Sequence, residues 1–216
     1  MRTVRTRPAL AAMLIVAASV FATAGAGHAE PEHQDHSARR TEDNGGIPDP
    51  SIMRQIKDIR HVTARYHSVH RALRDGYAAF AIPPAVGGTP TSGRGLPGDP
   101  TCFDNPSGGM GVHYVKGIDG VLDLEHPEAL VYAIGRRGRL ELVGVEYIVP
   151  KEFVDATHPQ TLMGQTLHAH PYLPVYVLHA WVWKSKPSGM FADYNPDVGS
   201  CSPTSGNVHR GATHAS

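Results

Sequence analysis

Apolar side chains recur every three or four positions in a long segment that follows Pro50. This spacing places them on one stripe of an α-helix, which buries that stripe against a core and leaves its other faces in water. Ser51 is a candidate N-cap and Gly76 a candidate terminator, so we expect the helix to run between them. The stripe consists of Ile52, Ile56, Ile59, Val62, Tyr66, Val69, Leu73 and Tyr77.

The second half of the chain is typical of short β-strands. Residues 110–115, 129–134, 139–149 and 174–183 are rich in β-branched and aromatic side chains. A long Gly- and Pro-rich stretch, 83–106, predicts a loop before them. We therefore expect an α+β fold, in which an N-terminal amphipathic helix packs on a mainly antiparallel sheet of about four or five strands, with one disulfide.

The N-terminus has the order of a secretory signal peptide. Arg2, Arg5 and Arg7 precede an apolar run at 9–21, and small residues follow as far as Ala29. The apolar run is shorter than the roughly 20 residues that span a bilayer. We expect cleavage near Ala26 or Ala29, a secreted or extracytoplasmic location, and no stable membrane anchor afterwards.

Composition divides the rest of the chain. Residues 30–50 are polar and charged and predict a disordered leader, 51–203 a single α+β domain, and 204–216 a flexible tail. Removing residues 1–29 takes away three arginines and no acid from a chain with 20 basic and 20 acidic residues, which leaves 17 and 20. This balance gives no electrostatic reason to bind nucleic acid or an anionic membrane surface. A small molecule is the candidate partner.

The chain has two cysteines, Cys102 and Cys201. Cysteines of exported proteins usually pair, because the compartment is oxidising. A bridge that closes a loop of about 100 residues stabilises by roughly 4–5 kcal/mol in the chain-entropy model. We predict this disulfide.

Three ionisable residues interrupt strands that are otherwise apolar. Side chains of a strand alternate between its two faces, so His179 shares a face with Val175, Val177, Trp181 and Trp183. By the same alternation Glu146 lies among Leu140, Leu142, Gly144 and Ile148, and His113 interrupts a third strand. Buried charges are costly, so these groups need each other, a hydrogen-bond partner or a cation.

Two imidazoles and one carboxylate can form a metal site with open positions. We predict that His113, Glu146 and His179 bind a divalent transition metal, zinc, copper or iron, with His170 as an optional fourth ligand. The competing interpretation is a hydrogen-bonded core in which Glu146 accepts from Tyr114 or Trp181 and the histidines pair with backbone carbonyls.

The leading functional prediction is a secreted metal-binding protein that could be a metalloenzyme. One alternative is a secreted module that binds a small hydrophobic molecule under a lid of Met190, Phe191 and Tyr194. Another is a metal-free enzyme that uses Glu146 and His179 for acid-base catalysis.

Several short motifs resemble a family of exported bacterial proteins, mostly of unassigned function. They cover roughly residues 56–201, and the resemblance implies that His113, Glu146 and His179 belong to the motif core. The motifs are Gly109-Met110-Gly111-Val112-His113-Tyr114, Pro127-Glu128-Ala129-Leu130-Val131-Tyr132, Val143-Gly144-Val145-Glu146-Tyr147, Leu178-His179-Ala180-Trp181-Val182-Trp183, and Gly189-Met190-Phe191 through Asn195-Pro196 to Cys201.

Overall fold

The computed structural model describes residues 49–82, 87–155, 158, 160–184 and 189–201. The predicted signal peptide, nearly all of the predicted leader and the predicted tail lie outside these residues.

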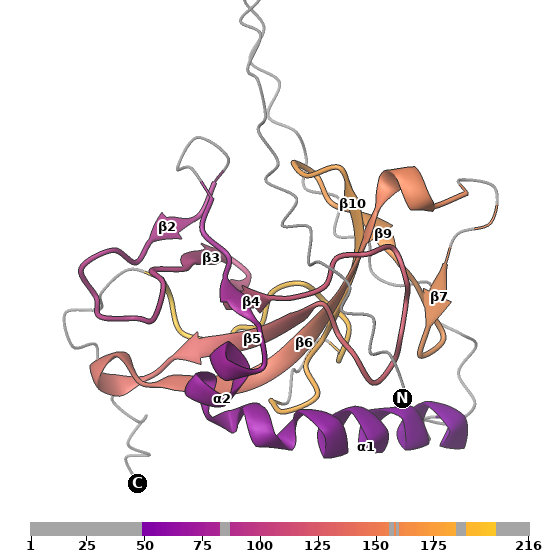
Figure 1. Cartoon of the computed structure of the whole chain (residues 1–216), viewed down its shortest axis with the longest axis horizontal. Helices are drawn as coiled ribbons and strands as arrows, with labels where there is room; N and C mark the ends of the chain where they lie inside the picture. Colours follow the sequence, from indigo (N-terminus) through magenta and orange to yellow (C-terminus); the bar gives the residue numbers. More distant parts are fainter. Residues whose placement is uncertain (1–48, 83–86, 156–157, 159, 185–188, 202–216) are drawn as a thin grey trace, which may run out of the picture. The chain divides into compact units, whose positions relative to one another are not determined.

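The described domain is built on an antiparallel sheet with the order β2-β3-β4-β5-β6-β10-β9, and β1 pairs with β4 (Figure 1). The pair β7-β8 forms a second, two-stranded sheet. The strands are β1 Ala78–Ala79, β2 Thr89–Pro90, β3 Thr101–Asn105, β4 Gly108–Val115, β5 Ala129–Ile134, β6 Leu140–Pro150, β7 Thr161–Leu162, β8 Gln165–Thr166, β9 His168–Ala169 and β10 Val175–Ala180.

The four predicted strands correspond to β4, β5, β6 and β10, but the sheet is larger than the expected four or five strands. The prediction of a continuous loop at 83–106 is wrong, because β2 and β3 lie within it. Five of the additional strands are only two residues long. Such strands are too short to show an alternating pattern, so their pairing depends on neighbours that the local sequence does not reveal.

The predicted long helix is divided into three parts, α1 Pro50–Thr63, the 3₁₀ turn η1 Ala64–His67 and α2 Val69–Arg74. Ser68 adopts an extended backbone and separates η1 from α2. The N-cap is Asp49, not Ser51, because the Asp49 carboxylate accepts a hydrogen bond from the Ser51 amide at 2.7 Å. Two further 3₁₀ turns are η3 Arg136–Gly138 and η4 Lys151–Phe153.

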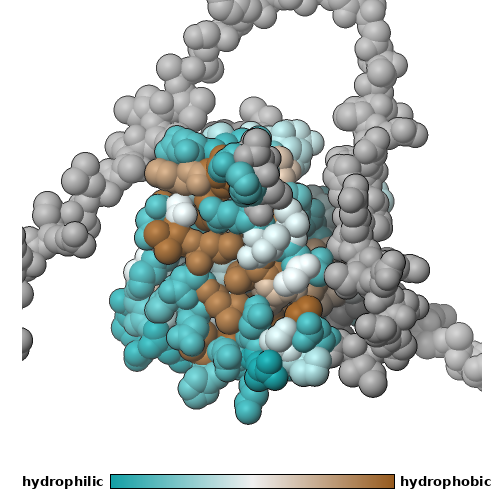
Figure 2. Space-filling view, turned by 90° about the vertical axis from the view of Figure 1, so that its right-hand side faces the viewer, coloured by the Kyte–Doolittle hydropathy of each residue, from teal (hydrophilic) through white to brown (hydrophobic). Residues whose placement is uncertain are grey.

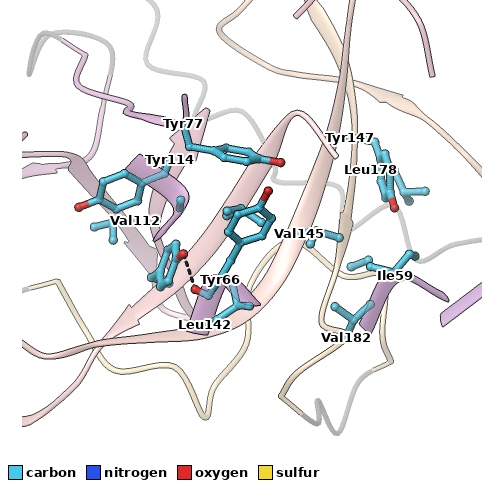
Figure 3. Close-up of a cluster of buried hydrophobic side chains, with 14 of the residues drawn as sticks. Ile59, Tyr66, Tyr77, Val112, Tyr114, Leu142, Val145, Tyr147, Leu178 and Val182 are labelled. Atoms are coloured by element: carbon cyan, nitrogen blue, oxygen red, sulfur yellow. Dashed lines mark hydrogen bonds between the residues drawn. The ribbon is translucent and has the colours of Figure 1, made fainter. Parts of the chain in front are cut away.

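The main hydrophobic core lies between α1 and one face of the sheet (Figure 1). Ile59 from the helix and Leu142, Val145 and Leu178 from the strands belong to it (Figure 3). Its tyrosines keep their hydroxyls paired, as where the Tyr132 hydroxyl donates to a backbone carbonyl of η1 at 2.7 Å. The stripe predicted from the sequence therefore supplies the helical side of this core.

Residues 189–201, called the strap, cover part of the opposite face. Val198 of the strap packs with Val131, Ala133, Val143 and Trp181. The strap is fixed by paired backbone hydrogen bonds between Asn195 and Gly109, at 2.9 and 3.1 Å. The sheet is thus covered on both faces.

The predicted disulfide is confirmed, because Cys102 and Cys201 are joined and both are buried. Cys102 lies in β3 and Cys201 at the end of the strap. Asp104, also in β3, accepts hydrogen bonds from the Ser200 hydroxyl and the Cys201 amide at 2.7 and 2.8 Å. The C-terminal end of the strap is therefore held both covalently and by hydrogen bonds.

Hydrophobic residues also reach the surface on the side that carries β7 and the start of α1. Figure 2 shows them gathered near the middle of that view with hydrophilic residues around them. None of the helices in the described part of the chain combines the length and the hydrophobicity that a membrane crossing requires.

Gly109 offers a test of how the strap docks. A Cβ added at Gly109 would lie 2.7 Å from the Gly199 carbonyl oxygen and 2.8 Å from Val198, whereas a Cβ at Gly199 would meet nothing within 4 Å. We expect Gly109→Ala to lower the free energy of unfolding by about 1–3 kcal/mol through overpacking. Gly199→Ala should change it by less than about 0.5 kcal/mol. Urea unfolding of both oxidised variants measures this, and equal midpoints would contradict the docking described here.

Candidate functional site

Cross-strand pairing brings the three predicted residues to one face of the sheet. Glu146 on β6 pairs directly with His179 on β10. His113 on β4 pairs with Val131 on β5, which in turn pairs with Gly144 on β6. Paired residues share a face, and Gly144 and Glu146 are two positions apart on one strand, so all three ionisable side chains lie on the same side.

A β-bulge on β6 changes the predicted composition of this face. The register between β5 and β6 shifts so that Val131 pairs with Gly144 and Tyr132 with Leu142, which leaves Val143 as the extra residue. The prediction that Leu140 and Leu142 share a face with Glu146 is therefore wrong, because both pack in the main core on the other side. Strict alternation holds only on the C-terminal side of the bulge.

Trp183 also departs from the predicted alternation. The strand β10 ends at Ala180, and the Trp183 indole donates to the Thr63 hydroxyl at 3.1 Å on the helical side of the sheet. Its ring also contacts the ring of His67, with centroids 4.4 Å apart. Trp183 is therefore part of the main core and not a neighbour of His179.

The three ionisable residues form a polar band between two apolar clusters. One cluster contains Val131 and Trp181, and the other contains Ala129, Ile148 and Val177. His113 and His179 are 3% and 1% exposed and Glu146 is 8% exposed, so water reaches the band very little. The arrangement places ionisable groups where burial opposes their charge.

Within the band, His113 Nε2 lies 3.5 Å from Glu146 Oε2. The rings of His113 and His179 have centroids 6.0 Å apart and meet edge to face. Aromatic rings complete the surroundings, since Phe103 contacts His113 at 5.9 Å and Trp181 contacts His179 at 4.3 Å between centroids. The band is therefore a compact group with an aromatic border.

Burial governs the protonation of His113 and Glu146. It lowers the pKa of His113 to about 3, with the neighbouring His179 adding to the effect, and it raises the pKa of Glu146 to about 8. At neutral pH both groups are therefore uncharged when no cation is bound. Their 3.5 Å separation is long for a hydrogen bond.

Neither ring nitrogen of His113 has a hydrogen-bond partner among the described residues. Buried polar atoms in folded proteins are nearly always paired, so this histidine requires an explanation. The hydrogen-bonded core considered above does not provide one, since Tyr114 donates to the Pro97 carbonyl and Trp181 donates to the Ala192 carbonyl. Glu146 is therefore not the acceptor of either side chain.

No group of three or more His, Cys, Asp or Glu side chains in the described ranges is already placed to hold a metal ion. His113 and Glu146 face each other closely, whereas His179 meets His113 with the edge of one ring toward the face of the other. The assignment of these residues as ligands therefore stays a prediction.

The predicted fourth ligand, His170, lies just beyond β9. Its Nδ1 accepts hydrogen bonds from the backbone amides of Tyr172 and Leu173, at 3.2 and 3.1 Å. Its neighbour His168 takes a more central position, because it pairs with Val177 on β10 and therefore shares the face of His179. His168 Nε2 also lies 3.3 Å from Oδ2 of Asp193 in the strap.

Sequence reasoning missed the pair of His168 and Asp193. The two belong to segments 25 positions apart, and only the docking of the strap brings them together. The predicted lid residues Met190 and Phe191 lie in the same strap and pack partly against the main core, while Tyr194 is half-buried.

Sequence reasoning also missed Glu128, a buried carboxyl on the helical side of the sheet. It directly precedes the wholly apolar strand β5, and its Oε2 accepts from the Ile148 amide at 3.0 Å. It lines an open cavity of about 730 Å³ together with Tyr66, Tyr77 and Lys116. A carboxylate placed immediately before an apolar strand is the sequence signal that could have identified it.

Comparisons with protein-family models, with curated proteins and with solved structures find no match for this chain. The resemblance to the exported family therefore remains a prediction that rests on the motifs alone.

Glu128 generates a pH prediction. Burial raises its pKa to about 7, so between about pH 4.5 and 7 the unfolded chain loses this proton while the folded chain keeps it. Folding stability therefore falls across that window, and the cost persists at higher pH. Glu128→Gln removes the cost, so we expect the variant to gain on the order of 1–3 kcal/mol relative to wild type between pH 5 and pH 8.

Urea unfolding at both pH values measures the change. Glu125→Gln alters an exposed carboxyl in the same segment and serves as the control. A difference between wild type and Glu128→Gln that stays constant with pH would show that Glu128 does not titrate in this range.

Proposed function

We propose that the protein binds a divalent transition metal with His113, Glu146 and His179, and that this site is its functional centre. The observation that carries the proposal is the buried His113, which has no hydrogen-bond partner among the described residues and lies 3.5 Å from the Glu146 carboxylate. Two donors that each bind one cation at about 2.1 Å with tetrahedral geometry are about 3.4 Å apart. The observed separation therefore suits shared coordination better than a direct hydrogen bond.

A cation also resolves the electrostatic conflict of the band. Without it, burial favours a protonated Glu146 carboxyl and a neutral His113 imidazole, which leaves few hydrogen-bonding options in an apolar setting. A divalent ion would favour the carboxylate and bind His113 in the neutral form that burial already imposes. Coordination of the ion would then offset the energetic cost of burying these groups.

The proposal requires one local rearrangement. His179 pairs with Glu146 across the strands, which places their Cβ atoms close together. Its ring must turn about the side-chain torsions to direct a nitrogen toward the point between His113 and Glu146. The backbone register need not change.

Two imidazoles and one carboxylate are ligands that suit zinc and iron, and imidazole also suits copper. Such a set leaves coordination positions open, and a bound water there would have a lowered pKa. This chemistry is compatible with a metalloenzyme as well as with a binding protein. The disulfide is compatible with the extracytoplasmic location that we propose from the N-terminal sequence.

Metal content tests the proposal. Mature protein prepared without a histidine tag, incubated with Zn²⁺, Cu²⁺ or Fe²⁺ and then desalted, should retain about one equivalent of one metal. His113→Ala combined with His179→Ala should retain less than about a tenth of an equivalent, because two of three ligands are lost. Plasma mass spectrometry measures both.

The matched control replaces two exposed helical histidines, His61 and His70, by alanine and should leave metal content unchanged. A metal present at 100 times its dissociation constant should also stabilise wild type by about 2.7 kcal/mol, but not the double site variant. The proposal fails if wild type retains less than a tenth of an equivalent of every metal, or if the site and control variants retain equal amounts. Catalysis that survives a chelator but not Glu146→Gln would instead support the acid-base alternative.

A further inference from the structure

A residue of the strap, Asp193, pairs with His168 of β9 on the face that carries the polar band. His168 pairs with Val177 of β10, two positions before His179, so the two histidines share a face of the sheet. The Nε2 atom of His168 lies 3.3 Å from Asp193 Oδ2. The side chains of His168 and Asp193 are 36% and 38% exposed, against 4% and 11% for His113 and Glu146. The pair is therefore much more accessible to solvent than the buried band is.

Both members of the pair act on the band electrostatically. Burial is the main cause of the raised pKa of Glu146, the negative charge of Asp193 raises this pKa further, and His168 lowers it. Among the charged groups that influence Glu146, Asp193 has the largest effect. The strand pairing independently places His168 diagonally next to His179, on the face that carries the band.

The backbone on both sides of Asp193 is anchored. The Ala192 carbonyl accepts from the Trp181 indole at 2.6 Å, and Asn195 exchanges two backbone hydrogen bonds with Gly109. Because these anchors are only three positions apart, this part of the strap has little freedom to lift. The Asp193 side chain can rotate while the anchored backbone stays in place.

Resting on the metal site proposed above, we propose that His168 and Asp193 form a latch that controls how fast the metal enters and leaves. A contact between two side chains of this exposure is weak, so it opens readily. Its loss affects rates without unfolding the protein. The carboxylate of Asp193 holds the latch closed and is not a metal ligand. The latch therefore changes the rates of uptake and release by the same factor and leaves the affinity nearly unchanged.

Stopped-flow mixing with Co²⁺ alone tests this, with Trp181 fluorescence as one signal because its ring contacts His179. Release is followed separately by transfer to an excess of chelator. Asp193→Asn should increase both rate constants about three- to tenfold, while the dissociation constant changes by less than about threefold. His168→Gln should have the same effect, and the double variant should add nothing further, because each change opens the same pair.

Asp197→Asn is the matched control, since it removes one negative charge from an exposed position of the same strap. If Asp193 acted only by attracting cations, removing its charge would slow uptake. The latch predicts faster uptake instead, so the sign of the change separates the two roles.

Three results would count against the latch alone, with the metal site intact. The first is unchanged or slower uptake in Asp193→Asn. The second is an equal effect of Asp193→Asn and Asp197→Asn. The third is a loss of metal affinity greater than tenfold in Asp193→Asn, which would make Asp193 a ligand. Failure of wild type to bind Co²⁺, Zn²⁺, Cu²⁺ or Fe²⁺ would overturn the metal site, and the latch with it.

Discussion

The backbone register that joins β4, β5, β6 and β10 is the constraint on which the rest of the structure depends. It sets Glu146 opposite His179 and brings His113 within 3.5 Å of Glu146 from two strands away. A shift of one residue in any of these pairings would move an ionisable group to the helical face and into the tyrosine-rich core. The bulge at Val143 preserves this arrangement, because it lets the apolar leucines of β6 face the helix while Glu146 faces the strap.

Burial of the polar band follows from covering both faces of the sheet. On one side α1 and its apolar stripe form the main core, and on the other side the strap packs Val198 against Trp181. The disulfide and Asp104 fix the end of the strap to β3, next to the strand that carries His113. The covering that stabilises the fold is therefore also what dehydrates the band. Dehydration lowers the pKa of His113 and raises the pKa of Glu146, and it keeps His113 in the neutral form that binds a cation.

Elements with a strong periodic pattern could be predicted from the sequence. The apolar stripe identified the helical segment, and the β-branched and aromatic residues identified the four longer strands. The disulfide could be predicted because the chain has two cysteines and an N-terminal sequence typical of export. The two-residue strands, the bulge at Val143 and the end of β10 at Ala180 could not be predicted, because tertiary hydrogen bonding determines them. The common face of His113, Glu146 and His179 needed the strand order, and the pair of His168 and Asp193 needed the docked strap.

The central claim is that His113, Glu146 and His179 share one metal ion, and a crystal structure of the metal-loaded mature protein tests it most directly. The account predicts a single strong anomalous peak about 2.0–2.2 Å from a ring nitrogen of His113, a carboxylate oxygen of Glu146 and a ring nitrogen of His179, with the backbone register unchanged. A metal-soaked crystal with no peak between these residues, and with both imidazoles hydrogen-bonded to ordered water or to the protonated Glu146, would contradict it.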